Sequence, residues 1–154
     1  MKIAGIFLAG MILSSPAQAF DGDTFSAKFD ALPKAVKDTA TAHMEHAFPV
    51  SITSAQSAQG WDYQINTRLD GKYHDLVIDE NGKLVAVKDE TDLTSLPAAA
   101  KAAIEKQTAA AKLVTLEKVT EGTQISYGAV LKDDAQGTVV QLRIAPDGTV
   151  KSKK

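Results

Sequence analysis

The histidines are the side chains whose types and spacing best suit a chemical site. His43 and His46 lie three residues apart in a segment expected to be helical, so both imidazoles can face one ion. Met44 beside them adds a thioether of the kind that copper accepts. No third ligand stands at a recognisable spacing, whereas a closed site needs about four. The alternative is a helix end, where cationic groups are favoured near the last carbonyls. Metal binding through His43, Met44 and His46 is therefore kept as an alternative to the binding function described below. No cofactor is expected.

The sequence carries little that predicts catalysis. It contains no cysteine, and no segment has the G-x-S-x-G pattern of a nucleophile elbow. Paired acidic residues such as Asp79-Glu80 and Asp133-Asp134 fall where turns or strand ends are expected, and short polar residues are common there for backbone reasons. We therefore predict no catalytic residue and a protein that is not an enzyme.

A polar face with an aromatic residue and two arginines is the best candidate for a binding surface. On one predicted strand Gln64, Asn66 and Arg68 alternate with apolar positions, so they share one face. Arginine and tyrosine are enriched at interface hot spots, although both also occur on ordinary solvated surfaces. The predicted partner-binding residues, for a protein or peptide partner, are Gln64, Arg68, Tyr73 and Arg143.

The opposite side of the same strands is predicted to be the core. Trp61, Tyr63 and Ile65 alternate along the first copy of the pattern, and Tyr127 and Ala129 do so in the second. A sheet with one covered and one wet face needs this alternation, because successive side chains project to opposite sides. We expect the aromatic rings to lie under a helix.

The elements that must position these residues occur twice. An offset of 64 carries Leu32-Pro33 onto Leu96-Pro97 and Tyr63 onto Tyr127, and an offset of 66 then carries Gly82 onto Gly148. The extra two residues fall in a hairpin loop at 133–137, where insertions cost little. Each copy is therefore predicted to be one α-β-β-β-β unit, with the copies at 32–90 and 91–154.

Turn and helix signals set the order within each copy. Pro33 and Pro97 suit the first turn of a helix, where a missing N–H has no partner to lose. The first helix is expected to run until Pro49 and the second over 97–107. Asn81-Gly82 and Asp147-Gly148 predict tight hairpins. The fold class is α+β: an antiparallel sheet, expected to be continuous, with the helices packed on one face. Two separate lobes are the alternative.

The N-terminal segment predicts export. Lys2 is followed by an apolar run and then by the small residues Ala17-Gln18-Ala19, which is the pattern of a secretory signal at 1–19 cleaved after Ala19. The run is too short for a membrane anchor, which needs about 20 apolar residues. Residues 20–31 are expected to be a lead-in. The net charge of −2 provides no basic field for nucleic acid. We expect a periplasmic protein that binds neither nucleic acid nor, after cleavage, the membrane.

The chain resembles the PepSY-like domain family over roughly 32–152. The features that carry the likeness are the helix opened by Leu32-Pro33, the Phe48-Pro49 pair, a strand with Trp61-Asp62-Tyr63, and the hairpin at 79–84. The family is related in fold to secreted β-lactamase inhibitor proteins. The resemblance implies an exported, non-catalytic binding module that inhibits or regulates an envelope enzyme such as a protease. The second copy has Lys112-Leu113 and Ile125 in place of Phe48-Pro49 and Trp61, so the copies are not expected to bind alike.

Overall fold

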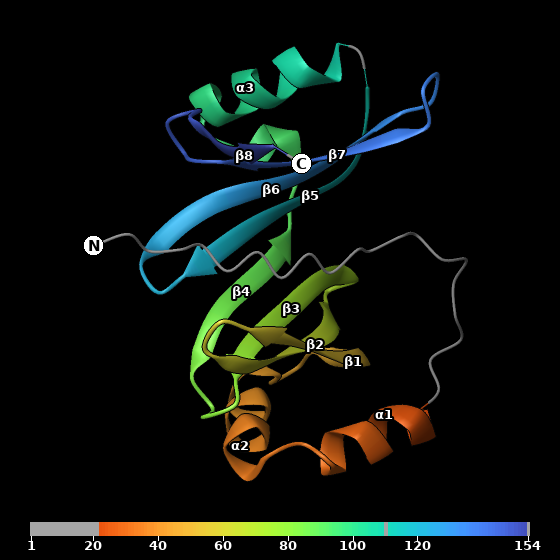
Figure 1. Ribbon diagram of the computed structural model, residues 1–154, viewed down its shortest axis with the longest axis vertical. Coiled ribbons are helices and arrows are strands. Elements are labelled where there is room, and N and C mark those ends of the chain that lie inside the picture. Colours follow the sequence, from red (N-terminus) through yellow and green to blue (C-terminus); the bar gives the residue numbers. More distant parts are fainter. Residues whose placement is uncertain (1–21, 110, 154) are drawn as a thin grey trace. The chain divides into compact units, whose positions relative to one another are not determined.

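A computed structural model describes residues 22–109 and 111–153. Eight strands form one antiparallel sheet whose spatial order follows the chain, β1 to β8 (Figure 1). The continuous α+β sheet predicted from the repeat is therefore confirmed, and it consists of two α-β-β-β-β halves whose helices touch the sheet. The signal segment predicted at 1–19 lies outside the described residues. Among those residues, no helix is long and apolar enough to cross a membrane.

The first two strands of each half match in length. In both halves these strands have 10 residues each. The first half has a two-residue turn after β2, whereas the second half has a four-residue loop at the equivalent place, after β6. The two-residue insertion predicted at 133–137 is thus confirmed. The strand bounds are β1 Phe48–Ser57, β2 Gly60–Leu69, β3 Lys72–Asp79, β4 Leu84–Glu90, β5 Lys112–Glu121, β6 Gln124–Asp133, β7 Thr138–Ile144 and β8 Val150–Lys153.

The strand pairs repeat down to their irregularities. The register between β1 and β2 shifts at Val50, and that between β5 and β6 shifts at Val114, the residue 64 positions later. Such bulges bend a strand and raise its local twist. Because the same bulge recurs at the same place, the two halves share their curvature as well as their order of elements.

Each half carries a helix that begins after a proline. Helix α2, Lys34–His43, follows Pro33, and helix α3, Ala98–Thr108, follows Pro97. The carbonyls of Pro33 and Pro97 accept the first helical hydrogen bonds, at 3.0 and 2.9 Å. Both prolines therefore act as predicted, at the boundary where their missing N–H costs nothing.

In each half, the hairpin between the last two strands packs against the start of the helix. A Cβ on Gly82 would lie 2.6 Å from the carbonyl oxygen of Ala35 in α2, and one on Gly148 would lie 2.7 Å from that of Ala99 in α3. Both glycines also have positive φ, +84° and +86°. Glycine is required for both reasons, because a side chain would be strained and would overlap the helix backbone.

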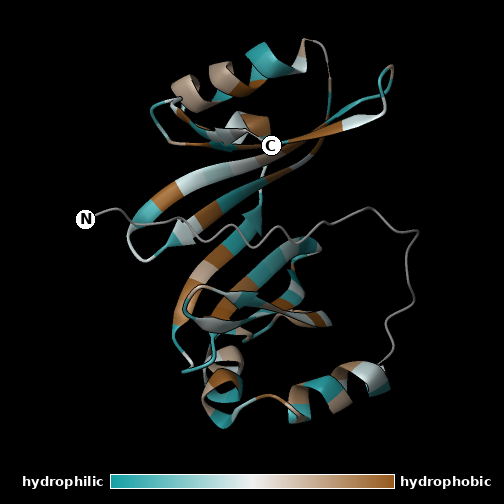
Figure 2. Cartoon of the chain, viewed as in Figure 1, coloured by the Kyte–Doolittle hydropathy of each residue, from teal (hydrophilic) through white to brown (hydrophobic). Residues whose placement is uncertain are grey.

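Apolar side chains fill the space between helix and sheet in each half. Val36, Ala40 and Ile65 are fully buried in the first half. In the second, Ala100 and Ile104 of α3 belong to a buried cluster with Tyr127 and Leu142 of the sheet. Figure 2 shows the resulting alternation of apolar and polar residues along the strands. The predicted burial of Tyr127 is confirmed.

One expectation about the helices was wrong. The first helix ends at His43 rather than near Pro49, because His46 adopts a left-handed φ of 67° and Phe48 already begins β1. The lead-in expected at 20–31 contains a helix, α1 (Gly22–Asp30), which stacks the rings of Phe25 and Phe29 and packs against β1. A short 3₁₀ turn at Leu93–Ser95 precedes α3.

Two expectations about the sheet faces also need correction. Trp61 lies on the core side of β2 but is 45% exposed, because it is the second residue of the strand, next to the turn; Ile125, its equivalent, is also exposed. The opposite face is not simply wet, since Asp62, Gln64 and Ser126 are almost completely buried. Tyr63 is partly buried.

The described chain packs as two compact units. Unit 1 contains the residues up to Asp70 together with Asp75–Val85, and unit 2 contains Gly71–His74 together with the residues from Ala86 onward. The strands β3 and β4 therefore contribute residues to both units. The repeat boundaries at 32–90 and 91–154 stay a prediction.

Candidate functional site

A row of paired residues crosses unit 2 on the face away from α3. The core uses Tyr127, Ala129 and Leu131 of β6, so the residues between them point to the other side. On that side the strand register aligns one residue from each of β4 to β8: Glu90, Glu117, Gly128, Arg143 and Ser152. Gly128 therefore lies between acidic Glu117 on one neighbouring strand and basic Arg143 on the other.

Gly128 provides the room in which the charged side chains meet. A Cβ at this position would lie 2.8 Å from Oε1 and 2.9 Å from Cγ of Glu117. The Glu117 side chain therefore folds across its cross-strand partner. Glycine inside a strand often marks such a close approach.

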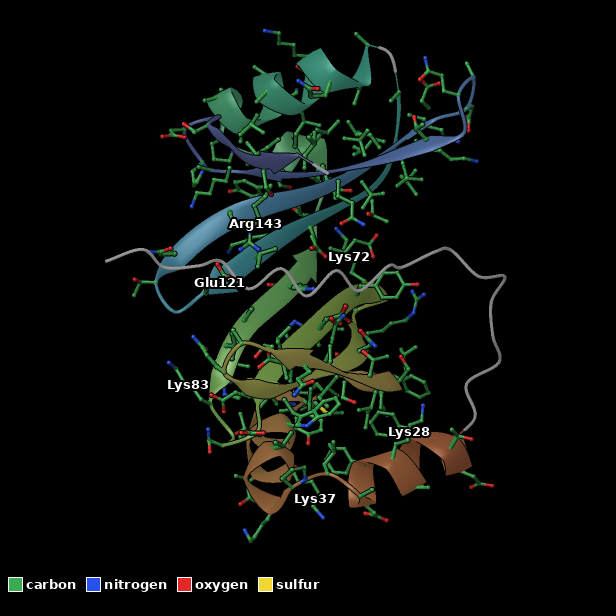
Figure 3. The ribbon with its side chains drawn as sticks, in the orientation of Figure 1. Lys28, Lys37, Lys72, Lys83, Glu121 and Arg143 are labelled. Atoms are coloured by element: carbon green, nitrogen blue, oxygen red, sulfur yellow. The ribbon has the colours of Figure 1, made fainter. Side chains whose placement is uncertain are left out.

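Arg143 is held by two hydrogen bonds. Its Nε donates to Oγ of Ser126 and its Nη2 donates to Oε2 of Glu121, both at 2.7 Å. The Arg143 side chain is only 16% exposed, and that of Glu121 is 35% exposed. Figure 3 labels both residues on the sheet of unit 2. A guanidinium fixed at two nitrogens loses little further freedom when another acceptor binds it.

Burial and charge act in opposite directions on Glu117. Burial raises the pKa of the Glu117 carboxyl above its usual value, and the positive charges of Lys88 and Arg143 offset part of that rise. A carboxylate in a low-dielectric setting is less stable unless cations stand nearby. We call this group the Arg143 cluster, and it consists of Lys88, Glu117, Glu121, Ser126 and Arg143.

The corresponding face of unit 1 carries a network of side-chain amide hydrogen bonds instead. Nε2 of Gln64 donates to Oδ1 of Asn66 at 2.8 Å and to Oδ2 of Asp75 at 3.2 Å. Nδ2 of Asn66 in turn donates to Oγ of Ser51 at 2.8 Å. Gln64 is 3% exposed and Asp75 is 2% exposed. Gln64 therefore makes its amide hydrogen bonds within the fold, and little of its side chain is available to a partner.

The four predicted partner-binding residues have different surroundings. Gln64 is internal, and Arg143 is half of an ion pair. Arg68 is exposed in unit 1, where it is the cross-strand partner of Phe48, itself 55% exposed. Tyr73, in unit 2, is partly buried, and its amide donates to the Glu90 carboxylate at 3.0 Å. Their role in binding stays a prediction.

The histidines do not belong to the Arg143 cluster. His43 ends α2 and His46 lies in the following turn, and both are exposed. In the described ranges, no three residues of histidine, aspartate or glutamate come close enough to hold a metal ion. His74 contacts Asp89 instead, with 2.6 Å between Nδ1 and Oδ1. Nothing in this arrangement favours the metal hypothesis.

Four members of the cluster were not predicted from the sequence: Lys88, Glu117, Glu121 and Ser126. Their side chains meet only through the pairing of β4 to β7, which no local pattern reveals. The sequence contained one signal. Gly128 lies between the apolar residues Tyr127 and Ala129, at a strand position where a polar side chain is expected. A glycine in a strand interior is a reason to expect a large neighbour across the strand.

These features define a class of protein in which two tandem α-β-β-β-β repeats share one antiparallel sheet. No protein-family model matches the sequence, and no curated protein matches it.

Solved structures match the fold. A protein of Bacteroides eggerthii with a provisional periplasmic assignment has a TM-score of 0.67 at 15% identity, covering 80% of this chain and 88% of its own. A DUF2874 family protein from Bacteroides ovatus has a TM-score of 0.65 at 17% identity, covering 81% and 88%. A BLIP-like protein from Bacteroides fragilis has a TM-score of 0.58 at 17% identity, covering 80% and 85%. At these identities the likeness shows the fold alone. It is a BLIP-like fold, as the resemblance to the PepSY-like family implied.

Proposed function

We propose that this chain is an exported binding module of the periplasm that docks a protein partner and thereby regulates an envelope enzyme. The observation that carries the proposal is the fixation of Arg143 between Ser126 and Glu121. The predicted signal at 1–19 and the provisional periplasmic assignment of the Bacteroides eggerthii protein support export. The description of the Bacteroides fragilis protein as BLIP-like supports an inhibitory role.

The Arg143 cluster suits recognition of a polar loop on a protein. Arginine carries five N–H donors, of which the two bonds to Ser126 and Glu121 use two. The remaining donors can meet a carboxylate or carbonyl of the partner, and the partly exposed Glu121 can accept a bond or pair with a cation. Specificity then comes from matching both charges at once.

The same cluster does not suit nucleophilic catalysis. The Ser126 hydroxyl is bonded to a guanidinium, whereas a serine nucleophile needs a neighbouring general base. We therefore assign the cluster to binding, and the chain is expected to have no turnover of its own.

Capture with matched variants tests the proposal. The full chain is expressed for export, its new N-terminus is sequenced, and the purified protein is immobilised against an envelope extract. Capture of a specific enzyme by the wild type should fall at least about tenfold in Arg143→Ala, and the captured enzyme should lose activity when the chain is added. Lys101→Ala removes the same charge from α3 and should capture normally.

A second variant separates binding from folding. Arg143→Lys keeps the charge but loses the planar fork, so it should fold and still bind several-fold more weakly. An N-terminus other than Phe20, capture that is equal in all variants, or a captured enzyme whose activity does not change would contradict the proposal.

A further inference from the structure

The two outer strands of the sheet are protected to different degrees. At one edge β8 is only 4 residues long and contains Lys151 and Lys153. At the other edge β1 is 10 residues long and has no charged residue. Short length and lysines are the usual defences of an edge against pairing with another chain. The β1 edge lacks both, and its proline and its bulge, at Pro49 and Val50, lie before the stretch 52–57.

The register identifies the backbone groups that face outward from β1. Ser57 pairs with Gly60 across a two-residue turn, and such a closing pair exchanges both of its hydrogen bonds. By alternation, the N–H and C=O groups of Gln56, Ser54 and Ile52 point away from β2. The neighbouring strand shows the same alternation. Trp61 is the cross-strand partner of Gln56, and its amide donates to the Glu80 carboxylate at 3.1 Å rather than to β1.

These outward groups make no hydrogen bond to the turns, loops or caps of the described residues. Among the described residues, no backbone hydrogen bond outside the helices and strands involves the amides of Ile52, Ser54 or Gln56. Ser54 and Gln56 are exposed. An extended chain lying beside β1 can therefore continue the sheet by one strand.

A shallow hollow lies beside the same stretch of β1. Apolar side chains of Leu32, Ile52 and Tyr63 line it together with Lys28, Ala31, Thr53 and Ser54. Figure 3 labels Lys28 on α1. The side chains of Ile52 and Ser54 are on the side of the sheet that the hollow occupies. A residue paired with Ser54 on an added strand would point to that same side.

We propose that the β1 edge binds an extended peptide by strand addition, with a large apolar side chain of the peptide seated in the hollow. Main-chain hydrogen bonds supply affinity in this mode, and pockets for alternate side chains supply specificity. Lys28 at the hollow favours a peptide that is neutral or acidic rather than basic. A second copy of β1 fits less well, because its Thr53, Ser54 and Ala55 are small and would leave the hollow empty.

The binding mode belongs to unit 1 and is independent of the function proposed for the Arg143 cluster in unit 2. Failure of one is therefore distinguishable from failure of the other. The variant Arg143→Ala should bind peptide at the β1 edge as the wild type does.

A displayed library of random ten-residue peptides, selected on the purified chain, provides the probe. The enriched peptides should carry apolar residues at alternate positions. Binding of the synthetic forms should weaken at least about tenfold in Ser54→Pro, which removes one outward N–H, and by less than about twofold in Ser54→Ala, which keeps it. N-methylation of alternate amides in the peptide should abolish binding to the wild type, and this readout does not depend on the folding of any variant.

Three results would overturn the proposal. A library that yields no enrichment would show that the edge takes no peptide. Enriched peptides that tolerate N-methylation bind elsewhere. Concentration-dependent dimerisation that Ser54→Pro removes would instead make a second copy of this chain the occupant.

Discussion

Glu117 of β5 and Gly128 of β6 are cross-strand partners, and the Glu117 side chain occupies the space where a side chain at position 128 would stand. This pairing places an acidic group beside the guanidinium of Arg143, the partner of Gly128 on its other side. The Arg143 cluster therefore depends on a residue that has no side chain.

Gly128→Ala should destabilise the protein by about 1–2 kcal/mol through overpacking, because the new Cβ meets Cγ and Oε1 of Glu117. Chemical denaturation measures the change. In a Glu117→Ala background the same substitution should cost at least about 1 kcal/mol less, since its obstacle has been removed. Equal costs in the two backgrounds would show that position 128 is constrained by something other than Glu117.

Stability should depend on pH through Glu117. Burial raises the pKa of this carboxyl in the folded state above its ordinary value of 4.5, so the folded state binds more protons than the unfolded chain above that pH. The contribution of Glu117 is fully present below pH 4.5 and is lost as pH rises through the raised folded pKa. The variant Glu117→Gln does not lose this stability as pH rises, because its side chain does not ionise.

The measurement is urea denaturation of both proteins from about pH 4 to pH 7. The stability of Glu117→Gln relative to the wild type should rise with pH over this window. A flat difference would mean that Lys88 and Arg143 cancel the effect of burial, and a difference that falls with pH would mean that they outweigh it.

Gly82→Ala and Gly148→Ala should each destabilise the protein by about 2 kcal/mol or more, because both glycines have positive φ and touch a helix carbonyl. Gly71→Ala is the control: its φ is +80° but nothing lies within 4 Å of its Cβ position. It should cost only about 1 kcal/mol. Thermal unfolding compares the three variants, and equal losses would remove the helix contact as a cause.

Arg143→Ala should lower stability by about 1–2 kcal/mol, because it leaves Ser126 and Glu121 without their donor on a partly buried face. Lys101→Ala breaks a pair whose Nζ and Oε1 atoms are 3.8 Å apart and about half exposed, so its effect should stay within about 0.5 kcal/mol. Denaturation midpoints of the two variants provide the comparison. An Arg143→Ala protein as stable as the wild type would mean that the two hydrogen bonds contribute nothing.

Sequence patterns predicted the features that local chemistry determines. Pro33 and Pro97 mark helix starts and Gly82 and Gly148 mark hairpins, because each of these residues restricts its own backbone. The 64-residue offset then joined the local signals into two repeats. The helix α2 was predicted to be too long because Met44 and Ala47 continue its apolar spacing. The backbone itself is no longer helical after His43, and His46 has a left-handed φ.

The candidate site could be predicted only in part. Arg143 was found because its residue type and face are visible in the sequence. Its partners were not, because Ser126 and Glu121 are 17 and 22 residues away along the chain and meet it through strand register. The expected exposure of Gln64 failed for a related reason: its amide hydrogen bonds are made to Asn66 and to Asp75 of the next strand, which no local pattern specifies.

The repeated contact between a hairpin glycine and a helix carbonyl has an evolutionary consequence. It ties each helix to its own hairpin in the same way in both copies, whatever residues the other sheet face carries. Position 143 can hold an arginine where the corresponding position of the first copy holds the buried Val77. Duplication of such a module leaves one copy to preserve the scaffold while the other acquires new recognition chemistry.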